Sequence, residues 1–239
     1  MKQRLDQTVG AMGITNSRSQ AESFIRLGKV TVNGKVVTKA GTMVSDSDKI
    51  VLTATEQYVS RAGLKLASVA ELLKVDFKNK VVLDVGSSTG GFTDYALQHK
   101  ASYVIAVDVG TNQLHPTLRG NPLIELHEQT DIRGLTETSK PLDIVVIDVS
   151  FISLREILPT VFKLATNATQ VVAMVKPQFE AGSSAKHKGI IKNDRMRRDI
   201  LQDFELWVKN SFVIQDKADS EVAGTKGNRE RFYLLKKSA

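Results

Sequence analysis

The chain has 239 residues, of which 41% are apolar and 25% charged, as in an ordinary globular protein. It contains no cysteine, which excludes disulfides and thiolate metal sites, and we expect a cytoplasmic location. The four histidines are scattered without ligand spacing, so no metal is expected. No stretch has the apolar length of a signal peptide or a membrane span, and we expect no membrane partner.

The net charge of +7 is concentrated near the start of the chain. Residues 1–54 hold eight Lys or Arg and four Asp or Glu, a balance of +4, and the remaining 185 residues hold +3. A basic excess of this kind attracts a polyanion, most often nucleic acid. A solvated basic surface would explain the charge alone equally well.

Residues 1–54 predict a small α+β domain. Ser17 and Gln20 fit a capping box that opens a helix, and Asn33-Gly34 between alternating residues is a strong hairpin signal. The expected elements are helices over 5–12 and 17–28 and strands over 29–32, 35–37 and 49–53. A linker over 55–62 is expected to follow.

Residues 63–239 alternate between apolar strands and amphipathic helices. Near-continuous apolar strands separated by helices indicate a parallel sheet covered on both faces. We therefore expect an α/β, Rossmann-like fold with a seven-stranded, mostly parallel sheet. The expected strands are 80–85, 102–109, 122–129, 142–149, 170–176, 212–218 and 231–237; the expected helices are 64–75, 92–100, 154–165 and 194–210, with a polar loop over 177–189.

Polar residues follow the apolar run of five of these strands. They are Asp84, Asp108, Asp131, Asp148 and Lys176. Because ligands bind beyond the carboxyl ends of the strands in an open parallel sheet, these residues predict one site.

The loop after the first of these strands, Gly86-Ser-Ser-Thr-Gly90-Gly91, departs from the G-x-G-x-x-G order of dinucleotide-binding proteins. Asp84 would repel a pyrophosphate and attract a cation, which favours S-adenosylmethionine as the cofactor. Asp108 would accept the ribose hydroxyls and Asp131 the adenine amino group. A nicotinamide-dependent oxidoreductase stays open as an alternative, since Asp108 follows Gly86 by a suitable 22 residues. The predicted cofactor residues are Asp84, Gly86, Ser88, Thr89, Gly90, Gly91, Phe92, Asp108 and Asp131.

Six stretches of the chain resemble the FtsJ-like ribose 2′-O-methyltransferases: "YVSRAGLKL", "VLDVGSSTGGFT", "AVDVGTNQL", "VVIDVSFISL", "VKPQFEAG" and "GNRERFYLL". With "SRSQAESFIRLGKVTVNG" before them, the chain resembles the TlyA family of ribosomal RNA methyltransferases, some of which are labelled haemolysins. The resemblance implies methylation of RNA, with ribosomal RNA or a ribosomal subunit as the partner. A membrane-lytic activity, suggested by the haemolysin label, is the remaining alternative.

The same resemblance implies a catalytic Lys-Asp-Lys-Glu tetrad, which falls on Lys65, Asp148, Lys176 and Glu230. A ribose hydroxyl must lose its proton as it attacks, so Lys176 is a candidate general base, favoured by a second cation and by burial. Lys176 could instead only orient the hydroxyl. The resemblance of residues 1–54 to a ribosomal-protein RNA-binding domain implies RNA contacts by Arg4, Arg18, Arg26, Lys29, Asn33 and Lys35.

Overall fold

The computed structural model describes residues 2–13, 15, 18–53, 58–182, 189–191, 193–222 and 227–238. Ser17, the expected start of the capping box, and residues 55–57 of the expected linker lie outside this part. Within the described ranges, no helix is both long and apolar enough to cross a membrane.

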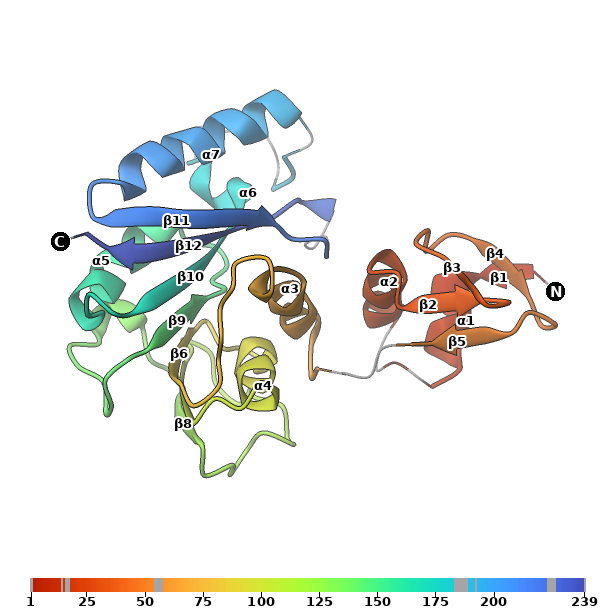
Figure 1. Cartoon of the computed structure of the whole chain (residues 1–239), viewed down its shortest axis with the longest axis horizontal. Coiled ribbons are helices and arrows are strands. Elements are labelled where there is room, and N and C mark those ends of the chain that lie inside the picture. Colours follow the sequence, from red (N-terminus) through yellow and green to blue (C-terminus); the bar gives the residue numbers. More distant parts are fainter. Residues whose placement is uncertain are drawn as a thin grey trace.

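The N-terminal unit combines two helices with two small antiparallel sheets (Figure 1). One sheet has the order β3-β2-β5, and its β2 and β3 flank the predicted Asn33-Gly34 turn. The other sheet pairs β1 with β4; both strands were missed by the prediction, because "KQR" and "MVS" carry no apolar alternation. The elements are β1 Lys2–Arg4, α1 Leu5–Ala11, α2 Arg18–Arg26, β2 Val30–Val32, β3 Lys35–Val36, β4 Met43–Ser45 and β5 Ile50–Leu52.

The prediction of seven strands in the large sheet is confirmed. Their spatial order is β11-β12-β10-β9-β6-β7-β8. The strands β10, β9, β6, β7 and β8 are parallel, while β12 runs antiparallel between β10 and β11. The strands are β6 Val81–Val85, β7 Tyr103–Val107, β8 Ile124–His127, β9 Ile144–Ile147, β10 Gln170–Val175, β11 Phe212–Asp219 and β12 Arg231–Lys237.

Helices cover both faces of this sheet, as the near-continuous apolar strands predict (Figure 1). One face packs against α3 Arg61–Ala70 and α4 Gly91–Gln98, and the other against α5 Leu154–Leu164 and α7 Asp194–Val208. The expected loop after β10 is partly wrong, because α6 Pro177–Glu180 begins there with a proline in its first turn. A 3-10 turn, η1, covers Ile132–Gly134.

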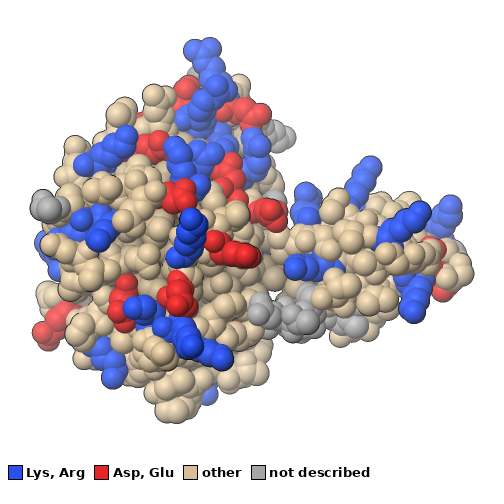
Figure 2. Space-filling model, in the orientation of Figure 1, with Lys and Arg blue, Asp and Glu red and all other residues tan. Residues whose placement is uncertain are grey.

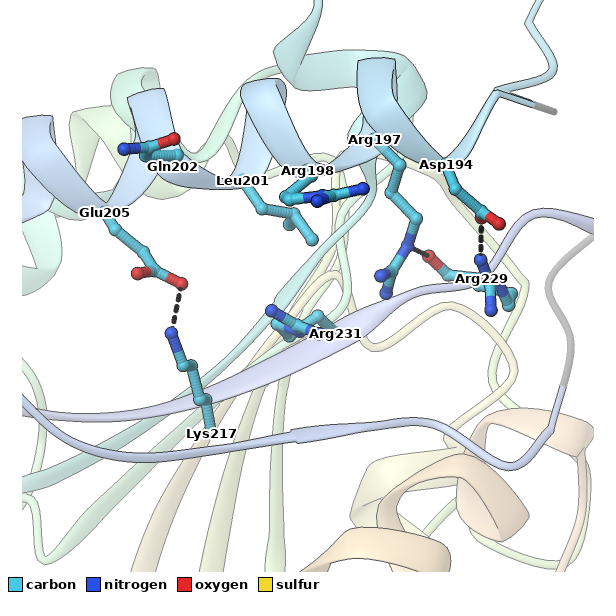
Figure 3. A pocket seen from close by; sticks show the side chains of 9 residues that line it. All are labelled: Asp194, Arg197, Arg198, Leu201, Gln202, Glu205, Lys217, Arg229 and Arg231. Atoms are coloured by element: carbon cyan, nitrogen blue, oxygen red, sulfur yellow. Dashed lines mark hydrogen bonds and ion pairs between the residues drawn. The ribbon is translucent and has the colours of Figure 1, made fainter.

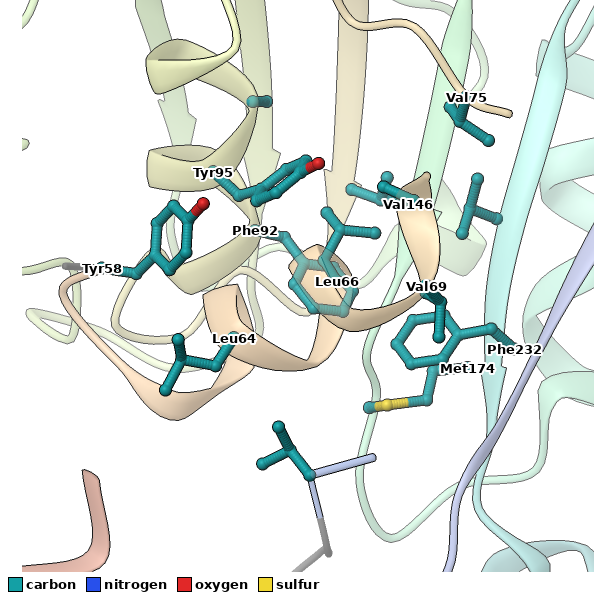
Figure 4. Packing of buried hydrophobic residues seen from close by; sticks show 14 of the residues in the cluster. Tyr58, Leu64, Leu66, Val69, Val75, Phe92, Tyr95, Val146, Met174 and Phe232 are labelled. Atoms are coloured by element: carbon teal, nitrogen blue, oxygen red, sulfur yellow. The ribbon is translucent and has the colours of Figure 1, made fainter. Parts of the chain in front are cut away.

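The face under α3 and α4 joins the two parts of the chain into one apolar core. Figure 4 shows Leu66 and Val69 of α3 close to Phe92 of α4 and Phe232 of β12. The buried Phe24 of α2 belongs to the same cluster of buried residues. Gln20 adds a polar contact between the parts, since its Nε2 donates to the carbonyl of Tyr58 at 3.1 Å.

Two glycines allow α3 and α4 to approach closely. A Cβ added to Gly63 would lie 2.5 Å from the Cβ of Tyr58 and 2.9 Å from the carbonyl oxygen of Gly91. Because both neighbours are backbone or close to it, neither can move without shifting the helices. Lys65 follows Gly63 by two residues in the same helix.

We expect Gly63→Ala to lower the free energy of unfolding by about 1–3 kcal/mol, since overpacking outweighs the gain in helix propensity. Gly134→Ala is the matched control, because an added Cβ there would meet nothing within 4 Å. Urea denaturation of both variants measures the difference. Equal stability of the two variants would show that the contact between α3 and α4 can relax.

Candidate active site

The structure brings the predicted strand-end residues to one edge of the sheet. Asp84 lies within β6, Asp108 follows β7, Asp148 follows β9 and Lys176 follows β10. Two adjoining cavities of about 540 and 260 Å³ open there. Both are lined by Gly86, Ser88, Asp148 and Ser150. Their shared wall makes this edge one continuous candidate site.

Asp108 forms part of the wall of the larger cavity. Its two carboxylate oxygens accept backbone hydrogen bonds from Ser88 at 2.8 Å and from Gly110 at 2.7 Å. These bonds fix the carboxylate, and each oxygen keeps a lone pair for a ligand hydroxyl. The geometry therefore suits the predicted contact with a ribose.

Asp131 also lines the larger cavity, but its carboxylate already has a partner. Arg133 donates to both of its oxygens, and the backbone N–H of Arg133 donates to one of them at 2.9 Å. These hydrogen bonds hold the pKa of Asp131 below its usual value. The predicted contact between Asp131 and adenine would have to share this carboxylate with Arg133.

The glycine loop supports the same wall. Gly86 has a φ of +82°, and a Cβ there would lie 2.7 Å from the carbonyl oxygen of Asp148. Ser88 and Thr89 are exposed at the loop, and Phe92 is buried against Phe232 while also lining the smaller cavity. Gly90 and Gly91 begin α4 without lining either cavity.

The smaller cavity contains two buried hydroxyl groups that the sequence analysis did not single out. Among the described residues, Ser60 Oγ and Ser87 Oγ have no hydrogen-bond partner. Buried polar atoms are normally satisfied, so these hydroxyls indicate a place for a polar ligand. Both serines lie in stretches quoted for the family resemblance, but their lack of a partner depends on tertiary packing that the sequence does not show.

Asp84 is almost completely buried beside this cavity, with 1% of its surface exposed. Burial raises its pKa to about 7, and the nearby Asp148 adds to the rise. Thr93 Oγ1 donates a hydrogen bond of 2.6 Å to Asp84, which opposes it. A buried carboxylate of this kind suits a cationic ligand group, as the sequence predicted.

The four predicted tetrad residues form two buried lysine–carboxylate pairs. Lys65 Nζ lies 2.6 Å from Glu230 Oε2, and Lys176 Nζ lies 2.5 Å from Asp148 Oδ1. Lys176 also donates to Ser150 Oγ at 2.8 Å. Lys65, Asp148 and Lys176 line the smaller cavity, whereas Glu230 lies behind Lys65 and is 2% exposed. Removing one member would leave its partner charged and buried.

The predicted RNA-binding residues lie on the N-terminal unit, where Figure 2 shows several basic side chains. Arg4 and Arg18 both bind the buried Asp6, at 3.0 and 2.8 Å, so two cations share one carboxylate. Arg26 pairs with Glu22. Lys29 and Lys35 are exposed, whereas the side-chain amide of Asn33 bonds Asp48 and the backbone N–H of Lys49 within the turn.

The fold is Rossmann-like, and the carboxyl edge of its sheet holds two cavities beside two lysine–carboxylate pairs. The FtsJ-like methyltransferase family matches residues 58–237, and the S4 domain family matches residues 3–50. The chain belongs to the FtsJ-like methyltransferase family and also carries an S4 domain.

Relatives cover nearly the same length. Hemolysin A of Brachyspira hyodysenteriae is 38% identical over 95% of this chain and 97% of its own. The 23S rRNA (cytidine-2′-O)-methyltransferase TlyA of Campylobacter jejuni is 39% identical over 82% of this chain and 77% of its own. A solved structure from Streptococcus thermophilus, named a hemolysin, is 36% identical, with a TM-score of 0.73 over 99% of this chain and 89% of that one.

Asp84 generates a prediction about stability and pH. Its folded-state pKa of about 7 lies above the ordinary 3.8, so its ionisation destabilises the fold progressively between these values and fully above pH 7. We therefore expect Asp84→Asn to melt at least about 3 °C above the wild type at pH 8 and to lose more than half of this advantage at pH 5.

Differential scanning calorimetry of both proteins at the two pH values, without ligand, measures this difference. Other titrating groups are common to both proteins and cancel. An equal difference in melting temperature at pH 5 and pH 8 would show that the ionisation of Asp84 is not responsible.

Proposed function

We propose that the protein is an S-adenosylmethionine-dependent ribose 2′-O-methyltransferase that acts on ribosomal RNA. The observation that carries the proposal is the pair of lysine–carboxylate contacts, Lys65–Glu230 and Lys176–Asp148, beside the smaller of the two adjoining cavities. The name of the Campylobacter relative supports RNA as the substrate. The match to the S4 domain family supports an RNA-binding role for the N-terminal unit.

The cavities fit S-adenosylmethionine in their polar groups. Asp108 would hold the ribose hydroxyls in the larger cavity, and Asp84 would attract the amino group in the smaller one. The unpartnered hydroxyls of Ser60 and Ser87 would bond the polar amino-acid portion. Bound S-adenosylmethionine supplies a methyl group already activated by a sulfonium. The nicotinamide alternative has no support beyond the spacing of Asp108, and membership of a methyltransferase family argues against it.

In the proposed reaction, Lys176 would hold the ribose 2′-hydroxyl and take its proton. The ribose oxygen would gain the methyl group as the sulfur–carbon bond of the bound sulfonium breaks and the neutral thioether leaves. Asp148 and Ser150 fix the amine of Lys176 by contacts of 2.5 and 2.8 Å. Lys65, held by Glu230, supplies positive charge beside the developing negative oxygen.

We propose that residues 1–54 and 63–239 act as two domains joined by residues 55–62. The N-terminal domain would bind RNA through Arg4, Arg18, Arg26, Lys29 and Lys35. Asn33 would contribute mainly by shaping the turn, because both ends of its amide are already bonded. The membrane-lytic alternative has no observation in its favour among the described residues.

The direct test is transfer of a labelled methyl group from S-adenosylmethionine to ribosomal subunits, followed by mapping of the modified nucleotide. Label on a ribose 2′-oxygen of ribosomal RNA is expected. Label on a base or on protein, or no labelling at all, would contradict the proposal.

Lys176 provides a sharper test of the chemistry. We expect Lys176→Ala to slow methyl transfer by at least about a hundredfold, because a positioned general base is lost. Lys176→Arg should be nearly as slow, since a guanidinium does not release its proton at working pH. Single-turnover kinetics measure the rate, and calorimetry checks that cofactor affinity changes little. If Lys176→Arg kept most of the activity, Lys176 would act as a fixed positive charge and not as a base.

Phe151 is a further residue at the site that the sequence analysis did not identify. It is 91% exposed, lines the larger cavity and has a φ of +68°, which is unfavourable for a bulky side chain. Its ring lies 5.4 Å from that of Phe179. Strained backbone and an exposed aromatic ring beside Asp148 favour a functional role, and we propose that Phe151 stacks on a base of the RNA.

We expect Phe151→Ala to lower kcat/KM for RNA about tenfold, because stacking contributes about 1–3 kcal/mol per base. Phe151→Tyr should keep most of the activity, since it retains a flat aromatic face. Steady-state kinetics with RNA and calorimetry with the cofactor separate the two ligands. A loss confined to cofactor affinity would place the ring against the cofactor instead.

A further inference from the structure

A third cavity, outside the candidate active site, lies between α7 and the strands β11 and β12. It measures about 500 Å³. Figure 3 shows side chains from α7 and from the two strands pointing into the space between them. We call it the arginine groove; it is lined by Asp194, Arg197, Arg198, Leu201, Gln202, Glu205, Lys217, Arg229 and Arg231.

The groove has an excess of positive charge. Among the residues that the structure describes, five of its lining side chains are cationic and two, Asp194 and Glu205, are acidic. Asp219, next to the groove, is shared between Arg197 at 2.7 Å and Arg231 at 2.6 Å. Even with Asp219 counted, five cations face three carboxylates. The unbalanced charge favours an anionic ligand.

Two arginines at the groove are exposed enough to bind a ligand. Arg198 is exposed and makes no ion pair with any residue that the structure describes. Arg229 pairs with Asp194, but both side chains are exposed, at 58% and 74%. An exposed ion pair contributes little to stability, so a phosphate could replace Asp194 at low cost.

Residues 230–233, at the start of β12 and just before it, connect this groove to the candidate active site. Glu230 points to the α3 side and binds Lys65, and Phe232 follows it into the same core. Arg231 points to the opposite side, where Tyr233 belongs to the core under α7. Arg231 also pairs in register with Val175, the residue before Lys176. The groove therefore begins one strand away from the proposed base, across the same sheet edge.

We propose that the arginine groove binds phosphate groups of the RNA strand that continues from the target nucleotide. This rests on the proposed function. A phosphodiester is the anion that a ribose at Lys176 necessarily brings with it. Planar guanidinium groups from two directions suit its oxygens. The groove would thus fix the strand on the side of the sheet opposite α3.

Arg198→Glu tests the proposal without disturbing any ion pair of the groove. We expect it to weaken binding of an unmodified ribosomal RNA transcript about fivefold to tenfold, and to lower the salt slope by about one. Lys209→Glu is the matched control, because Lys209 is exposed at the other end of α7, about 16 Å away by helix rise. Fluorescence anisotropy at several salt concentrations measures both variants, with calorimetric cofactor affinity as a check on folding.

Each outcome decides the proposal separately from the proposed function. Equal RNA affinity and salt slope in the two variants would overturn the proposal that the groove binds RNA. This holds whether or not the wild type methylates RNA. Failure of the wild type to methylate ribosomal RNA would overturn the proposed function, while the binding comparison still tests the groove. If Arg198→Glu abolishes binding of pyrophosphate but leaves RNA binding unchanged, the groove serves a small phosphorylated molecule and the proposal is wrong.

Discussion

The candidate site depends on burying four charged side chains at the edge of an otherwise apolar sheet. Desolvation of a charge is costly, and the structure offsets it by pairing each lysine with one carboxylate at 2.5–2.6 Å. The pairs also join distant parts of the chain. Lys65 of α3 meets Glu230 before β12, and Lys176 after β10 meets Asp148 after β9. The same contacts that balance the charge therefore hold the site together.

The antiparallel strand β12 gives this constraint a second consequence. The segment that leads into β12 has side chains directed to both sides of the sheet. Glu230, just before the strand, completes one lysine pair, whereas Arg229 and Arg231 on either side of it line the arginine groove. The groove and the lysine pairs are thus two faces of one short segment. A change in the register of β12 would disturb both together.

Much of this arrangement could be predicted from the sequence. The seven strands were predictable because buried parallel strands form near-continuous apolar runs, and their carboxyl ends located Asp84, Asp108, Asp148 and Lys176. Lys65 was identified only through family resemblance, since a lysine in a helix is usually solvent-exposed.

Other features depend on tertiary packing. The pairing of β1 with β4 has no apolar alternation to reveal it, and the partnership of Asp131 with Arg133 depends on the geometry of a 3-10 turn. The exposure of Phe151 follows from a left-handed backbone at a non-glycine residue, which no local pattern announces. The arginine groove requires α7 and β12 to meet, although they are far apart in the sequence.

The distribution of charge resolves a conflict built into the proposed reaction. A cationic methyl donor favours negative charge around it, whereas RNA favours positive charge. The methyl group of the donor and the ribose oxygen of the RNA must nevertheless come into direct contact. The chain carries a net charge of +7, yet Asp84, Asp108 and Asp148 lie together on the cavity walls. Lys65 and Lys176, each paired with a carboxylate, share the smaller cavity with Asp84 and Asp148, while further arginines and lysines lie on the N-terminal unit and in the arginine groove. Because Asp84 is buried, its ionised form destabilises the fold. Such a cost is expected at a residue retained for function. Lys65 and Lys176 lie between the acidic cavity walls and the proposed RNA side, and each is paired with a carboxylate. The methyl group would be transferred beside these two pairs.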